Sequence, residues 1–176
     1  MRKLRSLIDT ASAQRLASAF ILSRVDYCNA VLAGLPTSTL EPLQRVLNAA
    51  ARFVAGATSR THVSGIMKSL HWLPIAYWIR FKLCVLMHGV HNGTNPLYLT
   101  DTTTPISSLP GHRQLRSAMT TEYDIPCTRT KFGDRAFSVA GPREWNALSA
   151  DTKNIIDLSS FKRAITTHFF VLAYLD

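Results

Sequence analysis

The sequence contains few acidic residues. Eleven Asp and Glu stand against 20 Lys and Arg in 176 residues, so the formal net charge is +9 and the isoelectric point is near 9.9. No acidic residue occurs between Glu41 and Asp101, although basic residues continue through that stretch. Such an imbalance is typical of proteins that bind a polyanion, and nucleic acid is the first candidate. The alternative is an ordinary basic surface that faces solvent.

Cysteine is scarce as well. Cys28, Cys84 and Cys127 are widely separated and form no CxxC pair, so the sequence predicts no disulfide framework. Each of the three lies in or beside an apolar pattern, which predicts buried thiols, and none has the local signature of a catalytic nucleophile. This usage of cysteine is typical of a reducing, intracellular compartment.

The sequence has no long uninterrupted apolar run. Residues 83–100 lack Asp, Glu, Lys and Arg, but His88, His91 and Pro96 interrupt them, which argues against a membrane span. The basic N-terminus is not followed by the apolar core and cleavage site of a signal peptide. We therefore expect a soluble protein that has no contact with a membrane.

Signatures of catalysis are missing too. The sequence contains neither a P-loop nor a GxGxxG motif. Two-metal phosphoryl transfer needs clustered carboxylates, and here even the closest pair, Glu122 and Asp124, stands alone. His88 and His91 have a spacing that zinc ligands adopt on a helix, but no third ligand is evident. The sequence therefore predicts no catalytic residue, no metal site and no cofactor.

Apolar periodicity predicts helices in the first half of the chain. The first stripe at helical spacing consists of Ile21, Val25, Cys28 and Leu32. The Gly-Leu-Pro string at 34–36 is expected to end this helix. The next helix is expected to begin with a capping box formed by Ser38 and Glu41, and to end at Gly56. A third helix over 75–90 is apolar on nearly every side, which favours a central place in a bundle.

The second half has a different character. Residues 94–111 are rich in Thr, Ser and Pro and predict a linker. Residues 123–127 and 136–139 look strand-like, so this region is either irregular or a small β-hairpin, followed by a short helix over 142–148. A C-terminal helix capped by Ser159 or Ser160 completes the chain. We expect a mainly α protein, a helical bundle with a small irregular or β-hairpin appendage, divided into 1–93, 94–111 and 112–176.

Two groups of basic residues are candidates for phosphate contacts. Four residues lie on the predicted helices, namely Arg45, Arg52, Arg80 and Lys82. Three others, in the irregular region, are Arg129, Lys131 and Arg135. They belong to a basic cluster that begins further upstream, at Arg113 and Arg116. Phe132, Phe137 and Trp145 accompany this second group, where aromatic rings either stack on bases or, as is more common, anchor a core.

Several strings, in this order and spacing, resemble the region after the palm in reverse transcriptases of jockey-like LINE elements, which are non-LTR retrotransposons. They are ILSRVDYCNA at 21–30, LP at 35–36, LQRV at 43–46, NAAAR at 48–52, HWLP at 71–74, TRTKFGDRAFSV at 128–139, SSFK at 159–162 and TH at 167–168. The resemblance extends from about residue 4 to residue 174. It implies that the first helices belong to the polymerase thumb, which grips the template–primer duplex, and that the remainder is the post-thumb region.

The resemblance also implies a parent polypeptide, an RNA-directed DNA polymerase that works in the nucleus. The catalytic aspartates of that family are expected upstream of Met1, so we expect the isolated chain to bind nucleic acid without being an enzyme. One alternative is a structural module that packs on the polymerase palm. Another is a decayed copy without function, because residues such as Cys127 and Gly89 stand where the family has basic ones.

Overall fold

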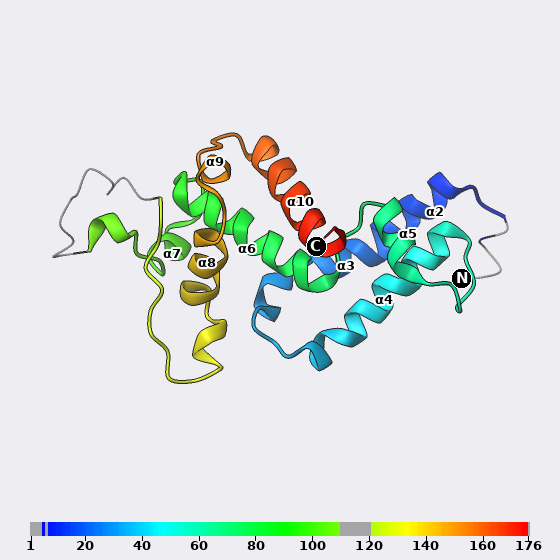
Figure 1. Ribbon diagram of the computed structural model, residues 1–176, viewed down its shortest axis with the longest axis horizontal. Helices are drawn as coiled ribbons and strands as arrows, with labels where there is room; N and C mark the ends of the chain where they lie inside the picture. Colours follow the sequence, from blue (N-terminus) through cyan, green and yellow to red (C-terminus); the bar gives the residue numbers. More distant parts are fainter. Residues whose placement is uncertain (1–4, 6, 110–120, 176) are drawn as a thin grey trace. The chain divides into compact units, whose positions relative to one another are not determined.

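The computed structural model describes residue 5, residues 7–109 and residues 121–175. Within these ranges the protein is mainly α, as expected, and Figure 1 shows helices joined by irregular segments. No strand forms in the described residues; a single isolated antiparallel bridge joins Pro105 to Tyr123. Of the two alternatives for the appendage, the irregular one is therefore confirmed. Arg113 and Arg116 lie outside the described residues.

The chain packs as two compact units. Unit 1 comprises Met1–Asn29, Leu35–Trp78 and Phe169–Asp176, and unit 2 comprises Ala30–Gly34 and Ile79–His168. Helices α6 (Ile75–His91) and α10 (Leu158–Tyr174) contribute residues to both. The predicted segments 1–93, 94–111 and 112–176 follow sequence character rather than packing, and they stay a prediction.

Unit 1 begins with a run of helical turns that changes type twice. These turns are α2 (Thr10–Ala17), the π-helix η1 (Ser18–Leu22) and α3 (Ser23–Asp26). The carboxylate of Asp9 caps α2 by accepting the backbone N–H groups of Ala11 and Ser12.

The single helix predicted to reach Gly34 instead ends at Asp26. Tyr27 is extended, and Cys28 has a left-handed φ of 53°, so the chain turns out of the helix there. The 3₁₀ turn η2 (Asn29–Leu32) follows.

Helix α4 (Thr37–Ala55) forms the centre of unit 1. It ends at Gly56 as predicted, with a left-handed φ of 65° that glycine adopts without a steric penalty. The predicted capping box is wrong, because the carbonyl of Pro36 already accepts the N–H groups of Thr39 and Leu40 and starts the helix earlier. Pro36 supplies no side-chain cap.

The core of unit 1 forms where α4 packs against α2 and α5 (Val63–Ser69). Its buried residues are Ala17, Ala50, Ala51, Val54, Met67 and Trp72. Small residues on α4 permit this close packing, and the side chain of Gln44 accepts the N–H of Ile75 at 2.9 Å at the start of α6. The hydroxyl of Tyr174 donates to the carbonyl of Trp72 at 2.6 Å, which places the end of α10 against the same core.

Unit 2 contains most of α6 and the chain that follows it as far as His168. Its other elements are α7 (Leu97–Thr100), η3 (Ile106–Ser108), η4 (Gly133–Arg135), α8 (Phe137–Asn146) and α9 (Ala150–Lys153). Helix α6 stops at Asn92 and Gly93 as predicted. Trp145 and Phe161, both fully buried, lie 5.9 Å apart between ring centroids and form the centre of its core.

The strand-like interpretation of residues 136–139 is wrong, since Phe137 begins α8, five residues before the helix predicted from Pro142. Tertiary packing explains the difference, because Val139 and Gly141 are buried in the helical conformation. A Cβ at Gly141 would lie 2.9 Å from the Sδ atom of Met87, so α6 and α8 approach too closely for a larger side chain.

The predicted cap of the last helix is also wrong. Helix α10 begins at Leu158, and the carboxylate of Asp157 accepts the N–H of Ser160 at 2.7 Å and the hydroxyl of Ser159 at 2.8 Å. These hydrogen bonds lower the pKa of Asp157 to about 2. None of the described helices combines the length and the apolar character that crossing a membrane requires.

Candidate nucleic-acid interface

Helix α4 presents two of the predicted site residues. Arg45 and Arg52 lie seven residues apart on one continuous helix, so they project from the same side. The guanidinium of Arg45 is 3.8 Å from the carboxylate of Glu41, and the two side chains are 73% and 62% exposed. Solvent screens such a pair, so a phosphate can displace Glu41 at little cost. Arg60 and Lys68 are exposed in the same unit, and these four cations form what we call the unit 1 basic surface.

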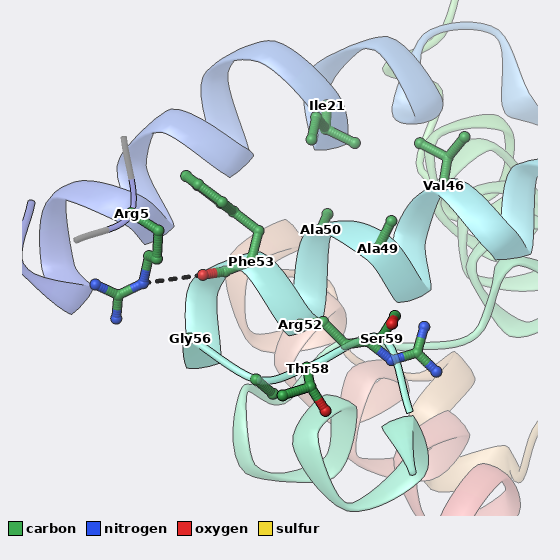
Figure 2. A pocket seen from close by; sticks show the side chains of 11 residues that line it. Arg5, Ile21, Val46, Ala49, Ala50, Arg52, Phe53, Gly56, Thr58 and Ser59 are labelled. Atoms are coloured by element: carbon green, nitrogen blue, oxygen red, sulfur yellow. Dashed lines mark hydrogen bonds between the residues drawn. The ribbon is translucent and has the colours of Figure 1, made fainter. Parts of the chain in front are cut away.

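A pocket of about 580 Å³ lies beside α4, within unit 1. Figure 2 shows Ile21 and Val46 on one side of it and Arg52 with Ser59 on the other. The Nε atom of Arg52 donates to the carbonyl of Thr61 at 3.0 Å, which fixes the side chain along the rim. The pocket therefore combines an apolar wall with an oriented guanidinium and a hydroxyl.

Arg5 lines the same pocket but has a structural role. Its guanidinium donates to the carbonyls of Phe53 and Val54 at 3.0 and 3.1 Å, and to the carbonyl of Ile8 at 2.8 Å. The bond to Phe53 is drawn in Figure 2. The last carbonyls of a helix lack partners within the helix, so Arg5 satisfies the end of α4. No pattern in the sequence indicates this contact, which joins residues nearly fifty positions apart.

The two predicted residues on α6 differ from those on α4. The Nε atom of Arg80 lies 2.7 Å from the carboxylate of Glu144, and the side chains are only 35% and 19% exposed. This partly buried pair joins α6 to α8, so a phosphate at Arg80 would have to compete with Glu144. Lys82 is half-buried on the same helix. Both residues stay predictions, although their surroundings favour a structural role.

The other three predicted residues surround η4 in unit 2, within what we call the 129–135 loop. Arg129 and Lys131 are exposed. Arg135 is half-buried; its aliphatic stem lies where a side chain at Gly34 would be, since a Cβ there would be 2.8 Å from Cγ. The Nε atom of Arg135 is buried and has no hydrogen-bond partner among the described residues. An unsatisfied donor of this kind costs about 1–3 kcal/mol.

Internal hydrogen bonds hold the 129–135 loop in shape. The hydroxyl of Thr128 donates to the carboxylate of Asp134, and the N–H of Gly133 donates to the hydroxyl of Thr130 at 3.0 Å. The one acidic residue of the loop thus bonds to Thr128. Arg129 and Lys131 remain at the surface, where a phosphate can reach them.

Three aromatic residues near this loop, Phe132, Phe137 and Trp145, could either anchor the core or stack on bases. Trp145 is fully buried, and its indole N–H donates to the carbonyl of Thr121 at 2.7 Å, so it anchors the core. Phe137 is half-buried at the start of α8. Phe132 is 80% exposed, and the guanidinium carbon of Arg135 lies 5.8 Å from its ring centroid. Phe132 is therefore available to stack on another ring.

Both members of the close histidine pair contact residues of unit 2, but only His88 is buried, and His91 is exposed at the end of α6. The Nε2 atom of His88 lies 2.8 Å from the carbonyl of Ile155, and its ring stacks on Phe161 at 4.2 Å. His91 lies 5.2 Å from the Trp145 ring, and its Nδ1 is 3.3 Å from the hydroxyl of Tyr123. In the described part of the chain no three His, Cys, Asp or Glu side chains gather as metal ligands would.

The surroundings of His91 predict a pH dependence of stability. Burial lowers the pKa of His91 from its ordinary value of 6.5, and the neighbouring His88 lowers it further. The unfolded state therefore binds a proton at a higher pH than the folded state does, so stability falls as the pH drops below about 6.5. We expect urea midpoints to decrease from pH 7.5 to 5.5, and His91→Gln to reduce that decrease. The exposed His62→Gln is the control, and an equal pH dependence in all three proteins would contradict the prediction.

The cysteines only partly match the expectation of buried thiols. Cys84 is buried, and burial together with Glu144 raises the pKa of its thiol to about 12, which makes it a poor nucleophile. For Cys28 and Cys127 the expectation is wrong, since both are exposed. Cys28 lies at the turn that ends the first helical run, and Cys127 lies in the irregular segment before the 129–135 loop.

Comparison with known proteins adds no relative: no protein-family model, no curated protein and no solved structure matches this chain. The assignment of the candidate interface therefore rests on the geometry of the described residues. Two basic surfaces, one on each unit, carry exposed cations, and one of them also carries an exposed aromatic ring.

Proposed function

We propose that this chain is the non-catalytic C-terminal part of a retrotransposon RNA-directed DNA polymerase and that it grips the template–primer nucleic acid. The unit 1 basic surface and the 129–135 loop contact backbone phosphates. The observation that carries the proposal is the exposure of Arg45, Arg129 and Lys131: Glu41, which pairs with Arg45, is itself 62% exposed, and no acidic side chain in the described part of the chain is buried. Arginine suits this role because its planar fork binds phosphate oxygens in pairs.

The distribution of charge between the units supports the proposal. Unit 1 contains nine Lys and Arg and four Asp and Glu, a formal charge of +5. Unit 2 contains eleven and seven, a formal charge of +4. Each unit thus has a positive surplus of its own, which attracts a polyanion over distances longer than single contacts. The sequence strings that resemble LINE reverse transcriptases supply the second line of support.

The proposal is tested by measuring how binding depends on salt. We expect the chain to bind a primer–template duplex, with the logarithm of the association constant falling linearly against the logarithm of salt concentration. Each phosphate contact contributes a slope of about −0.9, because binding releases the counterions condensed on the duplex. Fluorescence anisotropy with a labelled duplex gives the slope. An association constant that does not change with salt concentration, or no binding at low salt, would contradict the proposal.

A second candidate is a structural module that packs on the polymerase palm. It is favoured by exposed apolar side chains along the first helical run of unit 1 and at the residue that follows it: Leu16 is 41% exposed, Phe20 68% and Tyr27 79%. Apolar side chains at these positions suit burial against another protein surface. This alternative requires that the chain binds a separately produced palm domain and that Phe20→Ser weakens the association, with binding to nucleic acid absent or unaffected.

A further inference from the structure

Phe132 differs from the other large apolar residues near the second basic group, because its ring lies outside the core. The ring is 80% exposed, at the rim of a pocket of about 400 Å³ within unit 2. A single exposed aromatic side chain is common and needs no explanation by itself. Here its position matters, since Lys131 precedes it, Arg135 follows three residues later, and the pocket beside it is mostly apolar.

The pocket is suited to a flat apolar group that is attached to an anion. Its walls include Val31, Leu86 and Phe137, and Arg135 is the one charged residue among the described residues that line it. The volume lies within the range of small-ligand sites, roughly 300–1,000 Å³. An apolar wall next to a guanidinium favours a ligand with both an aromatic face and a negative charge.

The cations around Phe132 indicate where that negative charge would lie. The guanidinium carbon of Arg135 is 5.8 Å from the ring centroid, and Arg129 and Lys131 are exposed in the same loop. The Nε atom of Arg135 is buried and has no hydrogen-bond acceptor in the described structure. A nucleotide supplies both parts, a base for the ring and a phosphate for the cations.

We propose that Phe132 stacks on an unpaired base of a single-stranded segment, whose phosphates contact Arg129, Lys131 and Arg135. The inference rests on the proposed function, and it specifies which form of nucleic acid the 129–135 loop takes. Bases inside a duplex are covered on both faces by their neighbours, whereas each base of a single strand can expose a face to an aromatic ring. The sequence preference is weak, because every base offers a face of this kind.

The test compares a blunt duplex with the same duplex carrying a single-stranded overhang of about six nucleotides. Affinities for the intact chain are measured by fluorescence anisotropy at one salt concentration. We expect the overhang to raise the affinity about tenfold, the contribution of one stacked base. Phe132→Leu should remove that gain and leave the affinity for the blunt duplex within about twofold, while Phe132→Trp should retain it.

Two controls separate stacking from general effects. Tyr98→Leu removes another exposed aromatic residue of unit 2, 68% exposed on α7, and should leave the gain unchanged. An overhang that keeps its phosphates but has no bases should not raise the affinity of the unaltered protein. This control tests the proposal even if a variant folds poorly.

The outcomes distinguish the two proposals. If the blunt duplex binds with the expected salt dependence but the overhang adds nothing, the stacking site is wrong and the proposed function stands. The same holds if the gain survives Phe132→Leu or the removal of the bases. If neither form binds at low salt, the proposed function fails and the stacking site fails with it.

Discussion

Replacing Arg129 and Lys131 together by glutamine is expected to lower the affinity for a primer–template duplex about 200-fold at 50 mM salt. A phosphate contact with a slope of about −0.9 contributes roughly 15-fold at that concentration relative to 1 M, and two such contacts multiply. The salt slope should become shallower by about 2 in the same variant. Arg45→Gln with Arg52→Gln should have a similar effect, because both residues project from one side of α4.

The matched control is Lys162→Gln with Arg163→Gln. These two residues are exposed on α10, and their replacement removes the same charge from a part of the chain that is not in either proposed surface. The control pair should lower the affinity only a fewfold through the change in net charge. If all three double variants lose the same affinity and the same slope, binding depends on overall charge alone, and the two surfaces have no particular role.

Trp145→Ala is expected to lower the free energy of unfolding by about 3–5 kcal/mol, the usual cost of removing a large aromatic side chain from a core. Trp145 is fully buried, with the rings of His91 and Phe161 at 5.2 and 5.9 Å. Its removal also leaves the carbonyl of Thr121 without the indole N–H that donates to it at 2.7 Å. Urea unfolding followed by circular dichroism gives the difference.

Phe132→Ala is the natural comparison, because it removes an aromatic ring of the same region that is 80% exposed. We expect it to change the free energy of unfolding by less than about 0.5 kcal/mol. A loss of less than about 1 kcal/mol for Trp145→Ala, or an equal loss for both variants, would mean that Trp145 does not anchor unit 2.

The places where prediction from sequence failed have a common cause. The strand-like pattern at 136–139 is a local signal, whereas the burial of Val139 and the close approach of Gly141 to Met87 of α6 select the helix. The capping box at Ser38 has good local chemistry, but the carbonyl of Pro36 accepts the first N–H groups and begins α4 earlier. In both cases a neighbouring or distant contact outweighed a modest local preference.

The candidate site shows the same limit. Seven basic residues have the right chemistry in the sequence, but only the fold distinguishes Arg80, paired with Glu144 from another helix, from Arg45, which faces solvent. Phe132 and Trp145 look equivalent in the sequence, since both are aromatic residues among arginines. Their exposures, 80% and 0%, follow from packing between segments far apart in the chain.

The amino-acid sequence by itself determined the mainly α class, the ends of α4 and α6 at glycine-containing turns and the positive charge of the protein. These properties depend on the periodicity of apolar residues, on the backbone freedom of glycine and on composition, all of which are local or additive. The tertiary structure decided which cations are exposed, which aromatic ring is free to stack and where Arg5 closes the end of α4. Those properties depend on contacts between residues that are distant in the chain, because burial and pairing are set by the neighbours that folding brings together.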